Sequence, residues 1–145
     1  MKSNYNKIKE GKYVKYEFGF DLGDKVYCVF VGHIDEGIAN YMLIDKDGAF
    51  VYGEHGSVIG DASSVFRDRI EAEKYWLEKY SDTMDKYADA EFIIDIEDYA
   101  FDKTMYFDFA GYKDIPVKIS ENAKKPKLEI LRQVVDYINN HNEGK

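Results

Sequence analysis

The stretch Tyr13-Val-Lys-Tyr-Glu-Phe-Gly-Phe20 sets the pattern from which the fold is predicted. Its apolar residues recur at every second position, and Lys15 and Glu17 stand between them. A period of two with one apolar face is typical of a strand that turns one side to the core and the other to water. We therefore expect a half-exposed strand here.

Three further strand-like segments follow at short spacing. Residues 25–34 are apolar on both faces, which is typical of a central strand, and residues 38–44 form the next segment. Asp45-Lys-Asp-Gly48 predicts a hairpin turn, because glycine supplies the positive φ that such turns need, and residues 49–52 return from it. Since each connection is short, the four strands predict an antiparallel meander.

Helical patterns occupy the middle and the end of the chain. Ser63 or Ser64 can cap a helix that runs to about Tyr80, and residues 81–89 predict a second short helix or its continuation. Pro126 suits the first turn of a terminal helix. The inward stripe expected for that helix is Leu128, Leu131, Val134, Val135 and Ile138.

Length and composition favour one domain. A chain of 145 residues with 45% hydrophobic residues can fill a core, and a chain of this size buries roughly two-thirds of its unfolded surface. We predict a single α+β domain over residues 1–145, with an antiparallel sheet made of the four-strand meander and a C-terminal hairpin, packed with two or three helices. Residues 1–11 are polar and lysine-bearing, and we expect them to be flexible.

The C-terminal hairpin is predicted from Ala90–Tyr112, where apolar and acidic residues alternate. Residues 92–97 and 105–109 each have a period of two, and we expect them to pair. On this interpretation Asp95, Glu97 and Asp108 point outward from the apolar face.

Negative charge is concentrated in the same part of the chain. The net charge is −8, and residues 81–114 contain 3 basic and 10 acidic groups, whereas residues 1–80 contain 11 and 14 and residues 115–145 contain 6 and 4. A negative surface repels nucleic acid at long range and attracts basic surfaces. The charge therefore argues against direct binding of DNA or RNA.

The residue types that usually carry catalysis are sparse. His33, His55 and His141 are scattered without the spacing of a zinc motif, and Cys28 lies within a predicted strand, as a buried structural thiol does. A single cysteine fits a reducing compartment, and no apolar run predicts a signal peptide or a membrane span. We expect a cytoplasmic chain that is not an enzyme and that uses no catalytic residue, cofactor or metal.

The acidic surface is the most informative feature. It predicts an inhibitor that binds a basic protein such as a nuclease or another nucleic-acid-binding effector, with a surface similar in type to those of phage anti-defence proteins that imitate nucleic acid, among them anti-CRISPR and anti-restriction proteins. Tyrosine suits such a surface because it contributes contact area at low entropic cost. The residues expected to bind the partner are Asp82, Asp85, Asp89, Asp95, Glu97, Asp98, Tyr106, Asp108 and Tyr112.

Other interpretations stay open on the sequence. The chain fits an immunity protein that neutralises a nuclease toxin, and the acidic face also fits a merely solvated surface. A small ligand-binding or enzymatic domain would place a pocket near His33 and His55, with Asp35 or Glu54 at its rim. A dimer through exposed tyrosines and Trp76 is a further possibility, and the sequence leaves the oligomeric state undetermined.

Overall fold

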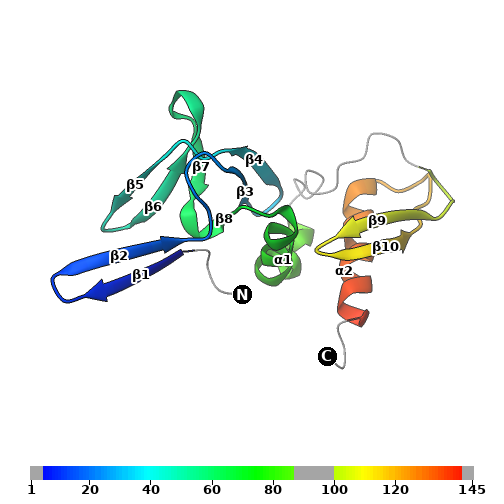
Figure 1. Cartoon of the computed structure of the whole chain (residues 1–145). Coiled ribbons are helices and arrows are strands. Elements are labelled where there is room, and N and C mark those ends of the chain that lie inside the picture. The colour runs from blue at the N-terminus through cyan, green and yellow to red at the C-terminus, as the bar shows by residue number, and fades with distance from the viewer. Residues whose placement is uncertain (1–4, 87–99, 142–145) are drawn as a thin grey trace. The chain divides into compact units, whose positions relative to one another are not determined.

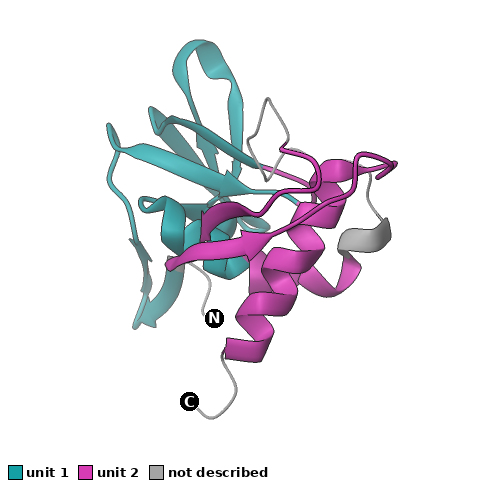
Figure 2. Ribbon diagram, turned by 90° about the vertical axis from the view of Figure 1, so that its right-hand side faces the viewer, with its two compact units in different colours: residues 1–30, 34–75 teal, residues 31–33, 76–145 magenta. Residues whose placement is uncertain are grey.

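Antiparallel strands and two α-helices make up the part of the chain that a computed structural model describes, residues 5–86 and 100–141 (Figure 1). This confirms the α+β class. The chain divides into two units, residues 1–30 with 34–75 and residues 31–33 with 76–145 (Figure 2). Folding as a single domain stays a prediction.

The first unit holds eight of the strands within the described residues, arranged in three small sheets. The sheets have the strand orders β1-β2, β4-β3-β8 and β5-β6-β7, and the paired strands are antiparallel. The strands are β1 (Tyr5–Glu10), β2 (Tyr13–Phe18), β3 (Lys25–Val29), β4 (Ile34–Ile38), β5 (Tyr41–Asp45), β6 (Gly48–Tyr52), β7 (Val58–Asp61) and β8 (Val65–Phe66).

The predicted four-strand meander in one sheet is wrong. Residues 25–34 are not one strand, because the chain turns back after Val29 and residues 34–38 form β4, which pairs with β3. The second side of β3 pairs with β8, so β3 has no edge left for β2. β2 pairs instead with β1, which lies within residues 1–11. The flexibility expected for residues 1–11 stays a prediction.

The hairpin turn predicted at residues 45–48 is confirmed. Asp45 and Gly48 are opposite each other at the ends of β5 and β6, and Gly48 has a φ of 150°. One carboxylate oxygen of Asp45 accepts hydrogen bonds from the backbone N–H groups of Asp47 (2.7 Å) and Gly48 (3.1 Å). The aspartate therefore satisfies the turn's own donors, which is why this residue type favours turns.

The core of the first unit joins the inner faces of the β3 and β6 sheets. Gly60 on β7 faces Cys28 on β3 so closely that a methyl group at Gly60 would overlap with the Cys28 Sγ. A glycine is therefore required for these two strands to approach each other. The buried residues of this core are Phe20, Val26, Cys28, Ala39, Ala49, Val51, Ala62 and Val65.

Helix α1 (Arg69–Tyr80) begins later than predicted. Asp68 caps it, since its Oδ1 accepts the backbone N–H of Ile70 at 2.9 Å. Ser63 cannot serve as the cap because it lies in a 3-10 turn before β8, where the carboxylate of Asp61 accepts its N–H. Trp76 of α1 is fully buried, so it offers no surface for a dimer.

The second unit combines a short 3-10 helix, a hairpin and the terminal helix. The 3-10 helix Ser81–Lys86 replaces the short α-helix expected there. Strands β9 (Met105–Phe109) and β10 (Tyr112–Val117) pair through a two-residue turn. Trp76 donates its indole N–H to the backbone oxygen of Val31 at 2.8 Å and meets the ring of Phe109 edge-on at 6.2 Å.

The terminal helix α2 (Pro126–His141) follows its prediction closely. Gln133 binds the backbone of Lys118 twice, accepting its N–H at 3.0 Å and donating to its carbonyl at 2.9 Å, which fixes the chain just beyond β10. No helix in residues 5–86 and 100–141 is long and apolar enough to span a lipid bilayer. All of the predicted stripe is buried, together with one further residue of the helix: Leu128, Ile130, Leu131, Val134, Val135 and Ile138.

The close approach of Gly60 and Cys28 predicts a specific packing defect. We expect Gly60→Ala to lower the free energy of unfolding by at least about 1–3 kcal/mol, because the methyl group overlaps with a packed neighbour and Gly60 has a φ of 155°, which other residues rarely adopt. In a Cys28→Ala background the same substitution should cost at least about 1 kcal/mol less, because the overlapping sulfur is gone. Urea denaturation measures both values.

Gly11→Ala is the matched control. Gly11 has a φ of 60° and nothing within 4 Å of an added Cβ, so alanine there brings backbone strain without overlap. We expect its cost to be the same with and without Cys28→Ala. An equal cost of Gly60→Ala in the two backgrounds would show that the overlap does not determine stability.

Candidate partner-binding surface

The exposed face of the β9-β10 hairpin carries the part of the predicted surface that the structure describes best. Tyr106 is 65% exposed and Asp108 is exposed, whereas Phe109 is 2% exposed. Neighbouring residues of a strand point to opposite faces, so Tyr106 and Asp108 lie on one face of β9, two positions apart. The predicted alternation of solvent-exposed and buried side chains is therefore confirmed for this strand.

Asp108 is fixed by the backbone of β10 but keeps most of its charge open to solvent. Its Oδ1 accepts the backbone N–H of Asp114 at 2.9 Å, and its Oδ2 lies 4.0 Å from the Nζ of Lys113. Both side chains of this ion pair are largely exposed, at 63% for Asp108 and 77% for Lys113. Such an ion pair is weak in water, so Lys113 neutralises little of the negative charge of the Asp108 carboxylate.

Tyr112 differs from its predicted place on this face. A two-residue turn, in which Ala110 and Gly111 have φ values of 52° and 87°, puts Tyr112 directly opposite Phe109. Opposite residues of an antiparallel pair share a face, and Tyr112 is accordingly half-buried. Its role as a partner-binding residue stays a prediction.

Strand β10 was not predicted, although it supplies the donor that holds Asp108. A register shift between Tyr112 and Ile115 interrupts its alternation, and Asp114 in this shift has a φ of 54°. Pro116 further weakens the strand pattern, since proline is uncommon in strand interiors. The signal that could have found the hairpin is Gly111, a turn residue between two apolar runs.

The other predicted binding residues fall into two groups. Asp82 is exposed in the 3-10 helix, and Asp85 follows one turn later, because such a helix has about three residues per turn. The remaining four, together with the predicted strand 92–97 and its pairing with β9, lie outside the described residues; they are Asp89, Asp95, Glu97 and Asp98.

The histidines proposed for an alternative site have unlike surroundings. His55 is exposed in the 3-10 turn Glu54–Gly56 with a φ of 60°, and His33 is half-buried between β3 and β4. Within residues 5–86 and 100–141 no three His, Cys, Asp or Glu side chains are grouped so that they could hold a metal ion. A ligand-binding or enzymatic site near these histidines stays a prediction.

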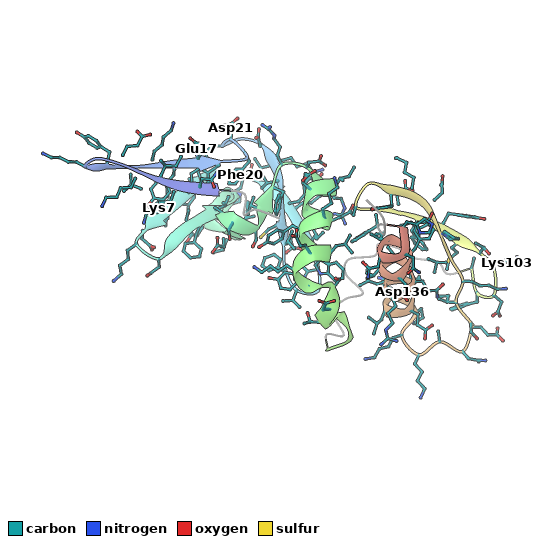
Figure 3. All side chains as sticks on the ribbon, turned by 90° about the horizontal axis from the view of Figure 1, so that it is seen from below. Lys7, Glu17, Phe20, Asp21, Lys103 and Asp136 are labelled. Atoms are coloured by element: carbon teal, nitrogen blue, oxygen red, sulfur yellow. The ribbon has the colours of Figure 1, made fainter. Side chains whose placement is uncertain are left out.

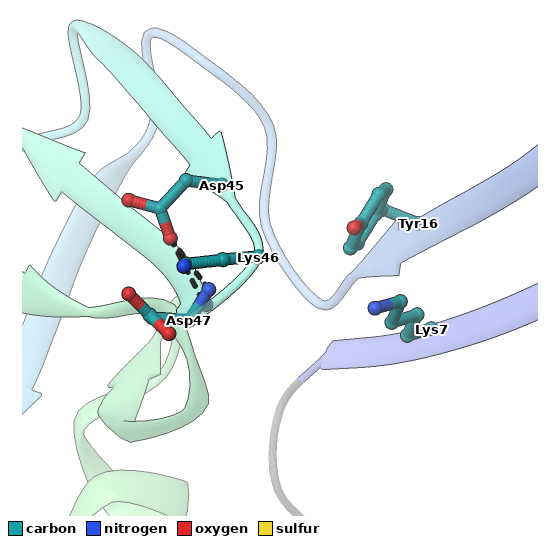
Figure 4. A pocket seen from close by; sticks show the side chains of 6 residues that line it. Lys7, Tyr16, Asp45, Lys46 and Asp47 are labelled. Atoms are coloured by element: carbon teal, nitrogen blue, oxygen red, sulfur yellow. Dashed lines mark hydrogen bonds between the residues drawn. The ribbon is translucent and has the colours of Figure 1, made fainter.

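A surface hollow of about 80 Å³ lies between the β1-β2 ribbon and the β5-β6 turn (Figure 4). Lys7 and Tyr16 line it from the ribbon, and Asp45, Lys46 and Asp47 line it from the turn. Its positive and negative groups are mixed, and the Asp45 carboxylate already accepts the donors of its own turn. This hollow therefore does not resemble a built ligand site.

Comparison with protein-family models, with curated proteins and with solved structures finds no match to this chain. The charge, exposure and position of the residues themselves are therefore what indicate a function. Among the predicted binding residues that the structure describes, Tyr106, Asp108 and Asp82 are exposed and lie in residues 81–114, the most acidic segment of the chain.

Cys28 is unsuited to act as a nucleophile. It is 1% exposed, and burial, together with the negative charges of Asp35 and Asp61, raises the pKa of its thiol to about 12. The thiolate is the reactive form of cysteine. With this pKa, only about one thiol in 10⁴ is ionised at pH 8.

This environment predicts that Cys28 resists alkylation in the native protein. At pH 8 we expect iodoacetamide to modify Cys28 at least about 1,000-fold more slowly in the folded chain than in urea, because both access and ionisation are suppressed. Mass spectrometry of timed samples measures the two rates. Native labelling at a rate near that of the unfolded chain would contradict the burial of this thiol.

Proposed function

We propose that this chain is a non-enzymatic inhibitor that binds a basic, nucleic-acid-binding protein through an acidic surface bearing tyrosine. The observation that carries the proposal is the side-by-side exposure of Tyr106 and Asp108 on β9, within a segment of 3 basic and 10 acidic groups. An exposed aromatic residue next to a positioned carboxylate suits recognition of lysine and arginine, since the ring supplies contact area and the carboxylate supplies charge.

The distance between the two exposed positions of β9 is similar to the distance between phosphates of a nucleic-acid strand. Positions 106 and 108 are two residues apart, which is about 6.6 Å along a strand. Phosphates of one nucleic-acid strand advance about 3.4 Å per nucleotide on the helix axis, so two steps span a similar distance. Position 106 is a tyrosine, so β9 supplies one carboxylate that can take the place of a phosphate in a basic groove, with an aromatic ring beside it.

The binding surface must be partly preformed for this mechanism to be efficient. The hydrogen bond from Asp114 to Asp108 orients the carboxylate before any partner arrives, and the β10 backbone supports it. Preorganised groups lose less freedom on binding, which raises affinity without further contacts. Asp82 adds a second negative group from the 3-10 helix Ser81–Lys86.

The partner we propose is a nuclease or another effector that binds DNA or RNA in a basic groove. A phage anti-defence protein and an immunity protein are both forms of such an inhibitor. They share one consequence, which is that the chain and nucleic acid compete for the same surface of the partner. Competition by added DNA or RNA therefore tests the shared mechanism.

Charge reversal at the described acidic residues should abolish this activity without unfolding the chain. The native partner is isolated on immobilised wild-type protein, and binding is then measured by titration with Asp82→Lys/Asp108→Lys. We expect affinity at least about tenfold weaker, because attraction becomes repulsion. Asp108→Lys also removes the acceptor of the Asp114 N–H, which costs about 0.5–1.5 kcal/mol, so circular dichroism at the assay temperature should show that the variant is folded.

Two variants control this experiment. Asp108→Asn keeps an acceptor for the Asp114 N–H but removes the charge, so it should lose less affinity than the reversal. Asp136→Lys reverses an exposed carboxylate on α2, outside the acidic segment (Figure 3), and should bind like the wild type. Equal binding by the double reversal and the wild type, or a partner whose binding nucleic acid does not displace, would refute the proposal.

A further inference from the structure

Strand β5 is an edge strand whose outer side has no partner strand among residues 5–86 and 100–141. The sheet has the order β5-β6-β7, so β5 pairs only with β6 in the described part of the chain (Figure 1). Its side chains are unusually apolar for such a position: Tyr41, Leu43 and Ile44 are 37%, 55% and 43% exposed. An edge strand with exposed apolar residues is a ready template for another strand.

The other described edges are protected in ways that β5 is not. Charged side chains or proline interrupt five of them, β7 has a shifted register at its pairing with β6, and β8 is two residues long. In β5 the one charged residue, Asp45, stands at the end of the strand. The interrupting residues are Lys7 and Lys9 on β1, Lys15 and Glu17 on β2, Asp35 and Glu36 on β4, Asp108 on β9, and Lys113, Asp114 and Pro116 on β10.

The register of the β5-β6 hairpin shows which backbone groups face the open edge. A two-residue turn makes Asp45 and Gly48 a hydrogen-bonded pair, and such pairs alternate along an antiparallel ladder. Leu43 therefore directs its N–H and C=O toward Phe50 on β6. Met42 and Ile44 direct theirs outward, to the edge that the described residues leave unpaired.

We propose that β5 is a self-association edge, on which a second copy of this chain pairs its own β5 in antiparallel orientation about a two-fold axis at Leu43. In this register Met42 of each copy is opposite Ile44 of the other. The two residues whose backbone groups face outward then exchange both hydrogen bonds. The pairing joins the β5-β6-β7 sheets of the two copies into one continuous sheet.

The side chains are complementary in the same register. Leu43 meets Leu43 of the second copy in a non-hydrogen-bonded pair, where opposite side chains approach most closely. Tyr41 of each copy, whose ring stacks on Tyr52 of its own sheet at 5.0 Å, is opposite Asp45 of the other, so no carboxylate is opposite another. The same strand of each copy thus forms both halves of the interface, which makes the interface isologous.

In the proposed register the charges of β5 do not repel one another. Each copy has a net charge of −8, so a contact between copies is disfavoured wherever acidic groups meet. The proposed register opposes no two carboxylates, because each Asp45 faces a tyrosine. The inference is independent of the proposed function, since it concerns β5 and makes no use of the β9-β10 hairpin.

Cysteine at position 43 tests the register directly. Opposite Cα atoms of a non-hydrogen-bonded pair are about 4.5 Å apart, which lies within the range that a disulfide bridges. With oxidised glutathione as the oxidant, we expect Leu43→Cys to form mainly a covalent dimer on a non-reducing gel. Leu22→Cys is the matched control, because Leu22 is 54% exposed and Leu43 is 55% exposed. Cys28 is buried and takes no part.

Sedimentation equilibrium supplies a test that needs no cross-link. The wild-type chain should sediment as a dimer that dissociates on dilution, and Leu22→Lys should behave in the same way. Leu43→Lys should be monomeric, because it places two lysines opposite each other at the axis, and circular dichroism should show that it is folded. A wild-type monomer at every concentration, a dimeric Leu43→Lys, or equal cross-linking at positions 22 and 43 would overturn the proposal.

Discussion

Open strand edges are the constraint on which the rest of this structure depends. The described strands form sheets of two or three members, so most strands have one side without a partner. Each such side presents backbone N–H and C=O groups that water or another strand must satisfy. An isolated two-stranded ribbon is only marginally stable in water, and β1-β2 is a sheet of this kind. Charged residues on the edges make wrong pairings costly and so help to keep each small sheet separate.

Protection of open strand edges also accounts for part of the acidic surface. Asp108 alone is explained by edge protection, because a carboxylate on β9 discourages another strand from pairing there. Tyr106 has no such explanation, since a tyrosine that is 65% exposed adds apolar area to an edge that the carboxylate protects. Its exposure next to a carboxylate held by the Asp114 N–H is what favours recognition of a partner over simple solvation.

The sequence predicted local features well where one short-range effect decides them. The Asp45–Gly48 turn and the buried stripe of α2 depend on turn chemistry and helical period, and both are confirmed. Strand partners depend on long-range competition, which periodicity does not encode. β3 is apolar on both faces and was correctly expected to be central, but nothing local showed that β8 would occupy its second side.

The candidate surface was predictable to a similar degree. Alternation placed Tyr106 and Asp108 outward, as the structure does, because a strand has a period of two. Tyr112 was misplaced because its position depends on the Ala110-Gly111 turn, which sets the register of β10 against β9. The bulge that brings the Asp114 N–H to Asp108 has no strand-like pattern, so the device that orients the carboxylate was not visible in the sequence.

Binding of a basic partner and self-association through β5 should depend on salt in opposite directions. A salt titration of the same protein therefore distinguishes the two interactions. Attraction between an acidic surface and a basic partner weakens as the screening length falls from about 30 Å at 0.01 M ionic strength to about 8 Å at 0.15 M. Pairing of two β5 strands brings together two copies of charge −8, so the same screening removes repulsion and strengthens it. Backbone hydrogen bonds and the Leu43 contact are themselves little affected by salt at these concentrations. A chain that binds its partner best at low salt should therefore be least dimeric under those conditions.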